Sequence, residues 1–405
     1  MSSTDLRTDA EAMREDLVAL RRELHQIPEI GLDLPRTQEA VLAALDGLPL
    51  EISTGEKLSS ITAVLRGGAP PAEGAGPVVL LRGDMDALPV AERSEESYRS
   101  RHENAMHACG HDLHTAGLVG AARLLSERRA ELPGDVVFMF QPGEEGWNGA
   151  SAMIDEGVLT AAGRPADAAY GLHVMSAILP SGIFACRPGP LMSASDALYV
   201  RVIGAGGHGS MPYTTLDPVP AACEMVTALQ TMITRRFNIF DPVVLTVGVL
   251  QAGTKRNVIP DDARFEATVR TYSPDNQARV KELATEVCEG IAAAHGLRVE
   301  VRYDMEYPVT VNNAAEAAFV DETVRAVFGD ERYIEAPNPV SPSEDFSFVL
   351  QNVPGAYLFL GACSAENTFA APSNHSPLAV FDDKVIPDGA AMLAELAVRR
   401  LARTN

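Results

Sequence analysis

The sequence predicts an α/β protein in which a mostly parallel sheet, flanked by helices, is interrupted by a smaller inserted α+β domain. In the first half, short apolar runs bounded by glycine and proline alternate with helical patterns, as in sheets covered on both faces. From about residue 190, apolar and polar residues alternate instead, which is typical of half-exposed antiparallel strands. A chain of 405 residues also exceeds the usual size of a single hydrophobic core.

We therefore expect a first domain built from residues 1–188 and 307–405, and a second, inserted domain at residues 189–306. The first domain begins with an amphipathic helix from about residue 10 to 26, because apolar residues recur there at helical spacing. Pro28 follows and ends it.

Four apolar runs in this first part predict buried strands, at Ile61–Leu65, Val78–Leu81, Val136–Phe140 and Ala168–Leu172. The Gly- and Pro-rich stretch Gly67–Pro77 predicts a loop. A helix is expected to start after His111. The C-terminal part adds a helix at 314–328 and a strand at Ala356–Leu360.

The inserted domain is predicted to have the order βαββαβ, which is that of a ferredoxin-like sandwich. Leu198, Val200 and Val202 alternate with polar neighbours, as expected of its first strand. Asp217 and Pro218 are typical of a helix N-cap and first helical position. The remaining strands are expected at 243–250, 263–270 and 298–303, with a helix at 275–294.

Composition argues against several classes of function. The chain has 55 acidic and 33 basic residues and a net charge of −22, so we expect neither a nucleic-acid nor an anionic-membrane partner. It lacks the run of about 18 apolar residues that a transmembrane helix needs. Five scattered cysteines fit a reducing compartment better than a disulfide framework. With no signal-peptide pattern, we expect a cytoplasmic protein.

The most informative motif is His107–His114, which contains three of the nine histidines and one of the five cysteines. Thiolate and neutral imidazole are ligands that zinc and its transition-metal neighbours prefer. Gly110 allows a backbone turn sharp enough to direct Cys109 and His111 at one point. A buried thiol beside helix-capping histidines is the alternative interpretation. The density of ligand-type side chains favours the metal site.

Further candidate ligands follow the ends of predicted strands; they are Asp84, Asp86, Glu144, Glu145 and His173, with His375 located between two prolines further on. Ligands of open α/β sheets bind outside the carboxyl ends of the strands, so we expect these side chains to meet at one metal site. One carboxylate of the glutamate pair could then bind metal while the other accepts a proton from water. Taken singly, paired glutamates are common on surfaces and strand-end histidines are often structural.

Gly204–Gly209 matches the G-x-G-x-x-G dinucleotide fingerprint. That fingerprint requires a helix to open at once, whereas here the next predicted helix waits until Pro218. We therefore predict a flexible glycine loop that carries His208 toward a substrate.

Taken together, ten motifs resemble the family of dinuclear-metal aminoacylases, hippurate hydrolases and auxin-conjugate amidohydrolases, which are relatives of the zinc exopeptidases. The matching motifs are His25–Gly31, Arg82–Pro89, His107–His114, Gln141–Gly146, Gly171–His173, Gly206–Ser210, Gly253–Thr254, Asn257–Pro260, Ser343–Phe346 and Asn374–His375. They span almost the whole chain in the family's order. The resemblance implies a zinc-exopeptidase-like fold with an inserted lid and dimerisation domain.

The resemblance also implies the roles of individual residues. Two divalent metal ions per subunit would be held by Cys109, His111, Glu145, His173 and His375, with the Cys109 thiolate as a bridge. Glu144 would be the general base and would then protonate the leaving amine. Asp86 would orient the ligands, and His208, from the same subunit or across a homodimer, would stabilise the oxyanion. Asn257 and Arg270 would contact the substrate.

One departure concerns the wider exopeptidases, which carry a ligand histidine in a His-x-Asp motif and a bridging aspartate. This chain has Asp84 at the histidine position and supplies Cys109 instead, which leaves the role of Asp84 open. A thiolate favours Zn²⁺, with Co²⁺ or Ni²⁺ as alternatives, over Mn²⁺.

The sequence therefore predicts a metal-dependent amidohydrolase that cleaves small N-acyl-amino acids of the hippurate or N-acetyl type. A metallo-carboxypeptidase or dipeptidase acting on short peptides is an alternative that uses the same site. A catalytically silent metal-binding protein is a third hypothesis, which the presence of Glu144 beside the complete ligand set disfavours.

Overall fold

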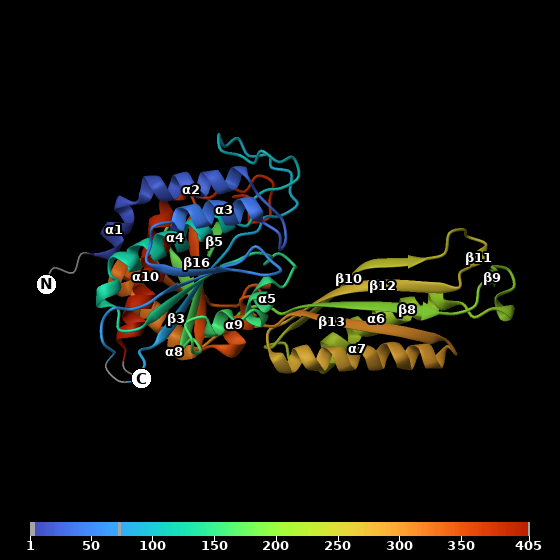
Figure 1. The fold of residues 1–405 in the computed structure, drawn as a ribbon. Coiled ribbons are helices and arrows are strands. Elements are labelled where there is room, and N and C mark those ends of the chain that lie inside the picture. The colour runs from blue at the N-terminus through green and yellow to red at the C-terminus, as the bar shows by residue number, and fades with distance from the viewer. Residues whose placement is uncertain (1–4, 72–73, 404–405) are drawn as a thin grey trace. The chain divides into compact units, whose positions relative to one another are not determined.

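The structure, a computed structural model, describes residues 5–71 and 74–403. This described part divides into two units. Unit 1 comprises the chain up to residue 191 together with 311–338 and 345 onward, and unit 2 comprises 192–310 and 339–344. Figure 1 follows the chain through both units.

The described residues of unit 1 form an eight-stranded sheet, whose strands stand in the order β1 (Leu50–Thr54), β2 (Ile61–Leu65), β4 (Asp135–Gln141), β3 (Val78–Asp84), β5 (Ala168–Pro180), β16 (Gly355–Cys363), β6 (Phe184–Cys186) and β15 (Tyr333–Glu335). The central strands β4, β3, β5 and β16 are parallel to one another. Strands β1 and β2 pair antiparallel with their neighbours. The predicted mostly parallel α/β sheet is therefore confirmed.

Strand β5 is longer than predicted. It continues beyond Leu172 to Pro180, and it pairs with β3 only as far as Gly171. His173 therefore lies inside a strand, just beyond the part that β3 covers, and not after the strand's end. Pairing with β16 on the other side supports this extension.

Helices cover both faces of the sheet (Figure 1); they are α1 (Leu6–Ala12), α2 (Arg14–Gln26), α3 (Pro35–Leu45), α4 (His111–Glu127), α8 (Ala314–Phe328) and α10 (Ile386–Ala402), with α5 (Gly149–Asp155) and α9 (Ser347–Asn352). Helices α4, α8 and α10 share one apolar core with alternate residues of the central strands. On the opposite face, Phe346 at the start of α9 packs on Tyr357 of β16.

Two details of these helices were not predicted. The single helix expected at residues 10–26 is two helices that meet at Met13. Gly120 lets α4 lie very close to its neighbours, because a Cβ there would be 2.7 Å from Ala390 Cβ of α10 and 2.9 Å from Leu17 of α2.

The predicted loop Gly67–Pro77 contains no helix or strand in its described part, and residues 72–73 lie outside the described residues.

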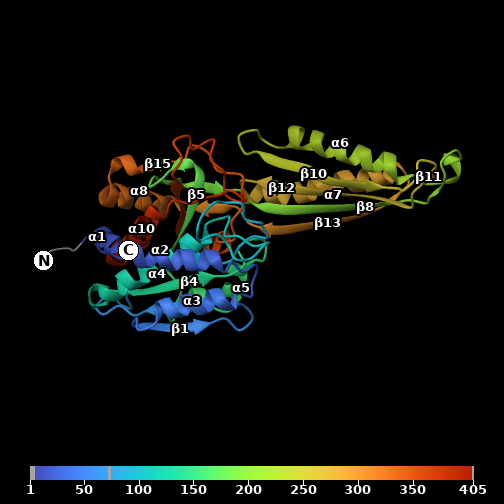
Figure 2. The same ribbon diagram turned by 90° about the horizontal axis from the view of Figure 1, so that it is seen from above.

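Unit 2 has the predicted βαββαβ order; its elements are β8 (Ser195–Ile203), α6 (Pro218–Arg236), β10 (Val243–Ala252), β12 (Asp262–Thr271), α7 (Pro274–Ala294) and β13 (Arg298–Tyr307). Within the described residues, the four strands form an antiparallel sheet in the order β10-β12-β8-β13, which is the ferredoxin-like arrangement (Figure 2). Asp217 caps α6 by accepting a hydrogen bond from Val219 N, as predicted.

The glycine loop between β8 and α6 forms the short strand β9 (Gly207–His208), which pairs with β11 (Val258–Ile259). The described chain after β9 contains only a single 3₁₀ turn at Pro212–Thr214 before α6 begins at Pro218, so no α-helix opens directly after the glycine loop, as a dinucleotide site would require. The remaining short strands are β7 (Gly189–Met192) and β14 (Thr310–Asn312). Among the described residues, no helix combines the length and apolar character needed to cross a bilayer.

The core of unit 2 gives a test of the fold. Phe265 is fully buried between the sheet and its helices, whereas Phe240 is 90% exposed. Phe265→Ala should lower the free energy of unfolding by about 3–5 kcal/mol because it leaves a cavity. Phe240→Ala should change it by less than about 0.5 kcal/mol. Guanidinium unfolding followed by circular dichroism measures both, and equal transitions for the two variants would contradict this packing.

Candidate metal centre

The centre is built where parallel strands end. β3 ends at Asp84, and the neighbouring β4 ends at Gln141, directly opposite Asp84 in the register. A Pro-Gly turn after Gln141, with Gly143 in the left-handed region at φ 73°, leads to Glu144 and Glu145. The two acidic segments are therefore placed at the same edge of the sheet, as predicted.

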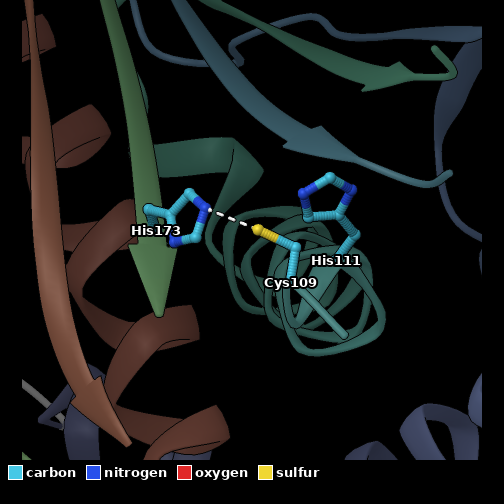
Figure 3. A group of neighbouring side chains, drawn as sticks. All are labelled: Cys109, His111 and His173. Atoms are coloured by element: carbon cyan, nitrogen blue, oxygen red, sulfur yellow. Dashed lines mark hydrogen bonds between the residues drawn. The ribbon is translucent and has the colours of Figure 1, made fainter. Parts of the chain in front are cut away.

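The His107–His114 segment reaches this edge through a sharp turn. Gly110 has φ 88°, and a Cβ at this position would lie 2.4 Å from Val174 Cγ2, so only glycine fits without strain. Helix α4 begins at the next residue, His111. Cys109 consequently lies in the turn and His111 in the first helical turn. Figure 3 shows the Cys109 sulfur between the imidazole rings of His173 and His111.

All five predicted ligands come together. Cys109 Sγ lies 3.3 Å from His173 Nε2 and 3.3 Å from His375 Nε2. His375 Nε2 is 3.1 Å from Glu145 Oε1, which lies 4.0 Å from His111 Nε2. His375 has 54% of its side chain exposed and Glu145 has 13%, so the centre is open to solvent on the His375 side.

The donor atoms fit a divalent cation. Within the described part of the chain, His111 Nε2 is buried and makes no hydrogen bond, while its Nδ1 lies 2.9 Å from the carbonyl of Asp86. His173 Nδ1 donates to the Val174 carbonyl at 2.8 Å, leaving Nε2 toward Cys109. Burial lowers the pKa of His173 well below its ordinary value, which favours the neutral form that binds metal.

Electrostatics at the centre favour positive charge. Contacts with Cys109 and then with Glu145 raise the pKa of His375 to about 10. Burial opposes the charged form of His111, but attraction by Asp84 helps to raise its pKa well above the ordinary value. A metal ion bound by these nitrogens would displace their protons, so its binding should strengthen as pH rises.

Asp86 fixes the glutamate pair. Its two carboxylate oxygens accept hydrogen bonds from the backbone amides of Glu144 and Glu145, each at 3.0 Å. The Glu144 side chain is buried, and donor atoms of Glu144, Glu145 and His111 lie within 4.8 Å of one another. Glu145 thus faces the imidazoles of His111 and His375, and Glu144 lies directly beside it.

Comparison with known proteins identifies the family. Residues 80–399 match the peptidase family M20/M25/M40. The chain belongs to this family. It is 35% identical to thermostable carboxypeptidase 2 of Saccharolobus solfataricus, over 97% of this chain and 98% of that protein. It is 36% identical to the IAA-amino acid hydrolase ILR1-like 2 of Arabidopsis thaliana, over 95% of this chain and 85% of that protein.

A solved structure from Bacillus subtilis, described as a dinuclear metal-binding peptidase of the M20 family, matches with a TM-score of 0.82 and 31% identity over 96% of this chain and 99% of that one. The predicted family resemblance and the prediction of a hydrolytic enzyme are confirmed. In this chain, the candidate ligand groups lie in unit 1, where the parallel strands β3 and β4 end.

The structure shows what Asp84 contacts in this M20 family chain. Asp84 Oδ1 lies 2.5 Å from His114 Nδ1, and Oδ2 accepts a hydrogen bond from Arg82 at 2.6 Å. His114 Nε2 accepts the backbone amide of Val174 at 2.8 Å. Both nitrogens of His114 are therefore engaged, so His114 supports the site without contributing a donor atom to the Cys109 cluster.

Arg82 was missed by sequence reasoning. Its fully buried guanidinium contacts Asp84, Gln141 and Tyr357, and also Asp345 at 3.2 Å. A cation in an otherwise apolar strand, two residues before a buried aspartate, is a signal that could have predicted a buried counter-charge.

The predicted substrate-contacting residues lie in unit 2. His208 is paired with Val258 in the β9–β11 ladder, and the amide after His208 donates to the Asn257 carbonyl at 2.9 Å. Figure 1 shows β9 and β11 beyond one end of the four-stranded sheet. Arg270 lies near the opposite end of β12, where it donates to Ser195 at 2.9 Å. Within unit 2, the structure brings His208 and Asn257 together but not Arg270.

The buried arginine provides a test. Arg82→Met removes the counter-charge of Asp84 and Asp345 and should destabilise unit 1 by about 3–5 kcal/mol, as expected when one partner of a buried ion pair is lost. Arg325→Met, which removes an exposed pair with Asp321, should have little effect. Urea unfolding of the two variants compares these losses, and similar stability for both would contradict the role of Arg82.

Proposed function

We propose that this M20 family enzyme hydrolyses the amide bond of N-acyl-amino acids and releases a carboxylic acid and a free amino acid. The convergence of Cys109, His111, Glu145, His173 and His375, with Glu144 directly beside them, carries this proposal. A structural metal site would need neither the second glutamate nor an opening to solvent at His375.

We further propose that these five side chains would hold two divalent metal ions. The Cys109 sulfur contacts His173 on one side and His375 on the other, so it belongs to two of the candidate ligand groups. Sulfur and imidazole donors favour Zn²⁺, with Co²⁺, Ni²⁺ or Mn²⁺ as alternatives. When bound, such ions supply a Lewis acid for the amide carbonyl and acidify water.

The protein groups supply the proton transfers. Glu144 would take a proton from the attacking water as the oxygen adds to the carbonyl carbon, and would deliver it to the leaving nitrogen as the C–N bond breaks. Asp86 keeps the Glu144 backbone in place through its hydrogen bond, so the carboxylate needs little reorganisation. The reaction consumes one water molecule for each amide bond that is cleaved and needs no other reactant.

We propose a chemical class of substrate for this enzyme and no single compound. Relatives are named for cleaving amino-acid conjugates and for carboxypeptidase activity, and both reactions hydrolyse an amide next to a carboxylate. We favour N-acyl-amino acids such as hippurate and N-acetyl-amino acids, because the sequence motifs resemble the amidohydrolase branch and the Arabidopsis relative is named for hydrolysing an amino-acid conjugate. Action on short peptides is the second candidate, supported by the carboxypeptidase relative.

The inserted segment, residues 189–306 by the sequence-based division, is proposed as the lid and dimerisation domain between catalytic segments 1–188 and 307–405. His208 would donate a hydrogen bond to the oxyanion, in its own subunit or across a homodimer. Asn257, beside it, would bind the substrate, whereas Arg270 is the weaker candidate because it lies away from both. All five cysteines fall within the described residues and none forms a disulfide, which supports a cytoplasmic location.

The general base is tested with Glu144→Gln. This change keeps the size of the side chain but removes its basicity, so turnover should fall by about 10²–10⁴-fold or more, while metal content measured by mass spectrometry stays at the wild-type level. Glu289→Gln, on the exposed face of α7, serves as the matched control and should retain full activity. A Glu144→Gln enzyme with wild-type turnover would refute the assignment.

Metal dependence and substrate class are tested together. Dialysis against a chelator should abolish hydrolysis of hippurate and N-acetyl-amino acids, and Zn²⁺, Co²⁺, Ni²⁺ or Mn²⁺ should restore it to different extents. Dipeptides assayed in parallel separate the two substrate classes. Full activity of the metal-free protein would exclude the proposed chemistry, and higher kcat/KM on dipeptides would favour the peptidase alternative.

A further inference from the structure

Asn374, the residue before His375, makes an unusual set of hydrogen bonds. Its Nδ2 donates to the carbonyl of Cys109 at 3.1 Å and to the carbonyl of Val174 at 3.0 Å. Its Oδ1 accepts from the backbone amide of Ser176 at 2.9 Å and lies 3.0 Å from the Ser176 hydroxyl, whose one hydrogen can go either to Oδ1 or to the Pro372 carbonyl at 2.9 Å. Both donors of the amide are therefore used, and its oxygen accepts at least one hydrogen bond.

These bonds join three segments that each carry a candidate ligand. The Cys109 carbonyl belongs to the turn before α4. The Val174 carbonyl, which also accepts from the His173 ring, belongs to β5. The third segment is that of Asn374 itself, which continues directly into His375. One side-chain amide thus links the backbones of Cys109 and His375 with the strand that carries His173.

The backbone of His375 needs such support. It has φ 70°, a left-handed conformation that is strained for a non-glycine residue and persists only where the surroundings impose it. Its own amide donates to the Ala108 carbonyl at 2.8 Å. The backbone of His375 is thus held by its own amide and by the side chain of the preceding Asn374. In this position its imidazole Nε2 lies 3.3 Å from Cys109 Sγ, whereas an unsupported segment would relax and move it away.

We propose that Asn374 is a positioning residue for metal binding: its amide holds Cys109, His173 and His375 in register, so that the three side chains form a preorganised metal site. This inference rests on the proposed metal-dependent function. It adds a requirement for an amide at position 374, because only an amide presents donors to two carbonyls and an acceptor to Ser176 at the same time.

The test replaces the amide by a group of the same shape. Asn374→Asp places a carboxylate oxygen opposite the two carbonyls, where a donor is needed. Asn312→Asp is the matched control in the same unit, since Asn312 Nδ2 also donates to two carbonyls, those of Tyr357 and Arg187, and Oδ1 accepts the Tyr357 amide. The probe is Co²⁺, titrated into metal-free protein against a competing chelator, with the thiolate-to-cobalt absorption recorded.

The expected result separates positioning from general stability. Both Asp variants should melt at a lower temperature than the wild type. Only Asn374→Asp should bind Co²⁺ about 10–100-fold more weakly, as is typical when a group that orients ligands is lost, and show a weakened thiolate absorption. Should an Asp variant not fold, the Asn374→Ser and Asn312→Ser pair, which adds no charge, repeats the comparison.

Two outcomes would overturn the inference. If the Asn374 variants bind Co²⁺ with wild-type affinity and absorption, or if the Asn312 variants lose affinity equally, Asn374 has no specific positioning role, and the proposed function still stands. If the wild-type protein itself binds no Co²⁺ through Cys109, the metal site fails, and this inference fails with it.

Discussion

Parallel alignment of β4, β3 and β5 is the constraint on which the candidate metal centre depends. Gln141 lies opposite Asp84, and Gly171 lies opposite Arg82. Because parallel strands finish at a common edge, the segments that follow β3 and β4 are delivered to the same place as the part of β5 that extends beyond β3. The turn that carries Cys109 reaches this edge only because Gly110 accepts a left-handed backbone against Val174.

This edge concentrates buried negative charge, and the structure balances it in distinct ways. Asp84 and Asp345 share the guanidinium of Arg82, and Asp86 is satisfied by two backbone amides. Buried charges of this kind are tolerated only when they are paired or hydrogen-bonded. Glu145 instead faces imidazoles, beside the unbonded Nε2 of His111. A divalent cation would complete the charge balance at that point.

The fold was predictable where local pattern is strong. The central strands, the βαββαβ order of unit 2 and the Asp217 cap follow from periodicity and capping chemistry, and they agree with the structure. The break at Met13 and the extension of β5 were not predictable, because each depends on packing against elements distant in sequence. Three-residue strands such as β6 and β15 carry no periodicity of their own. The roles of Arg82 and Asn374 were missed for the same reason, since their partners lie far away along the chain.

The kinds of candidate ligand in this protein, and their order along the chain, follow from short motifs, because each motif names its own thiol, imidazole or carboxylate groups. Which of those donor atoms remain available to a metal depends on contacts between segments that lie far apart in the chain. His111 and His114 belong to one motif and are three residues apart, yet both nitrogens of His114 are taken by Asp84 and Val174, while Nε2 of His111 faces Glu145 without a hydrogen bond. The difference arises because β3 and β5 bring partners within hydrogen-bond distance of both nitrogens of His114, whereas Nε2 of His111 lies 3.5 Å from Asp84 Oδ2 and 4.0 Å from Glu145 Oε1.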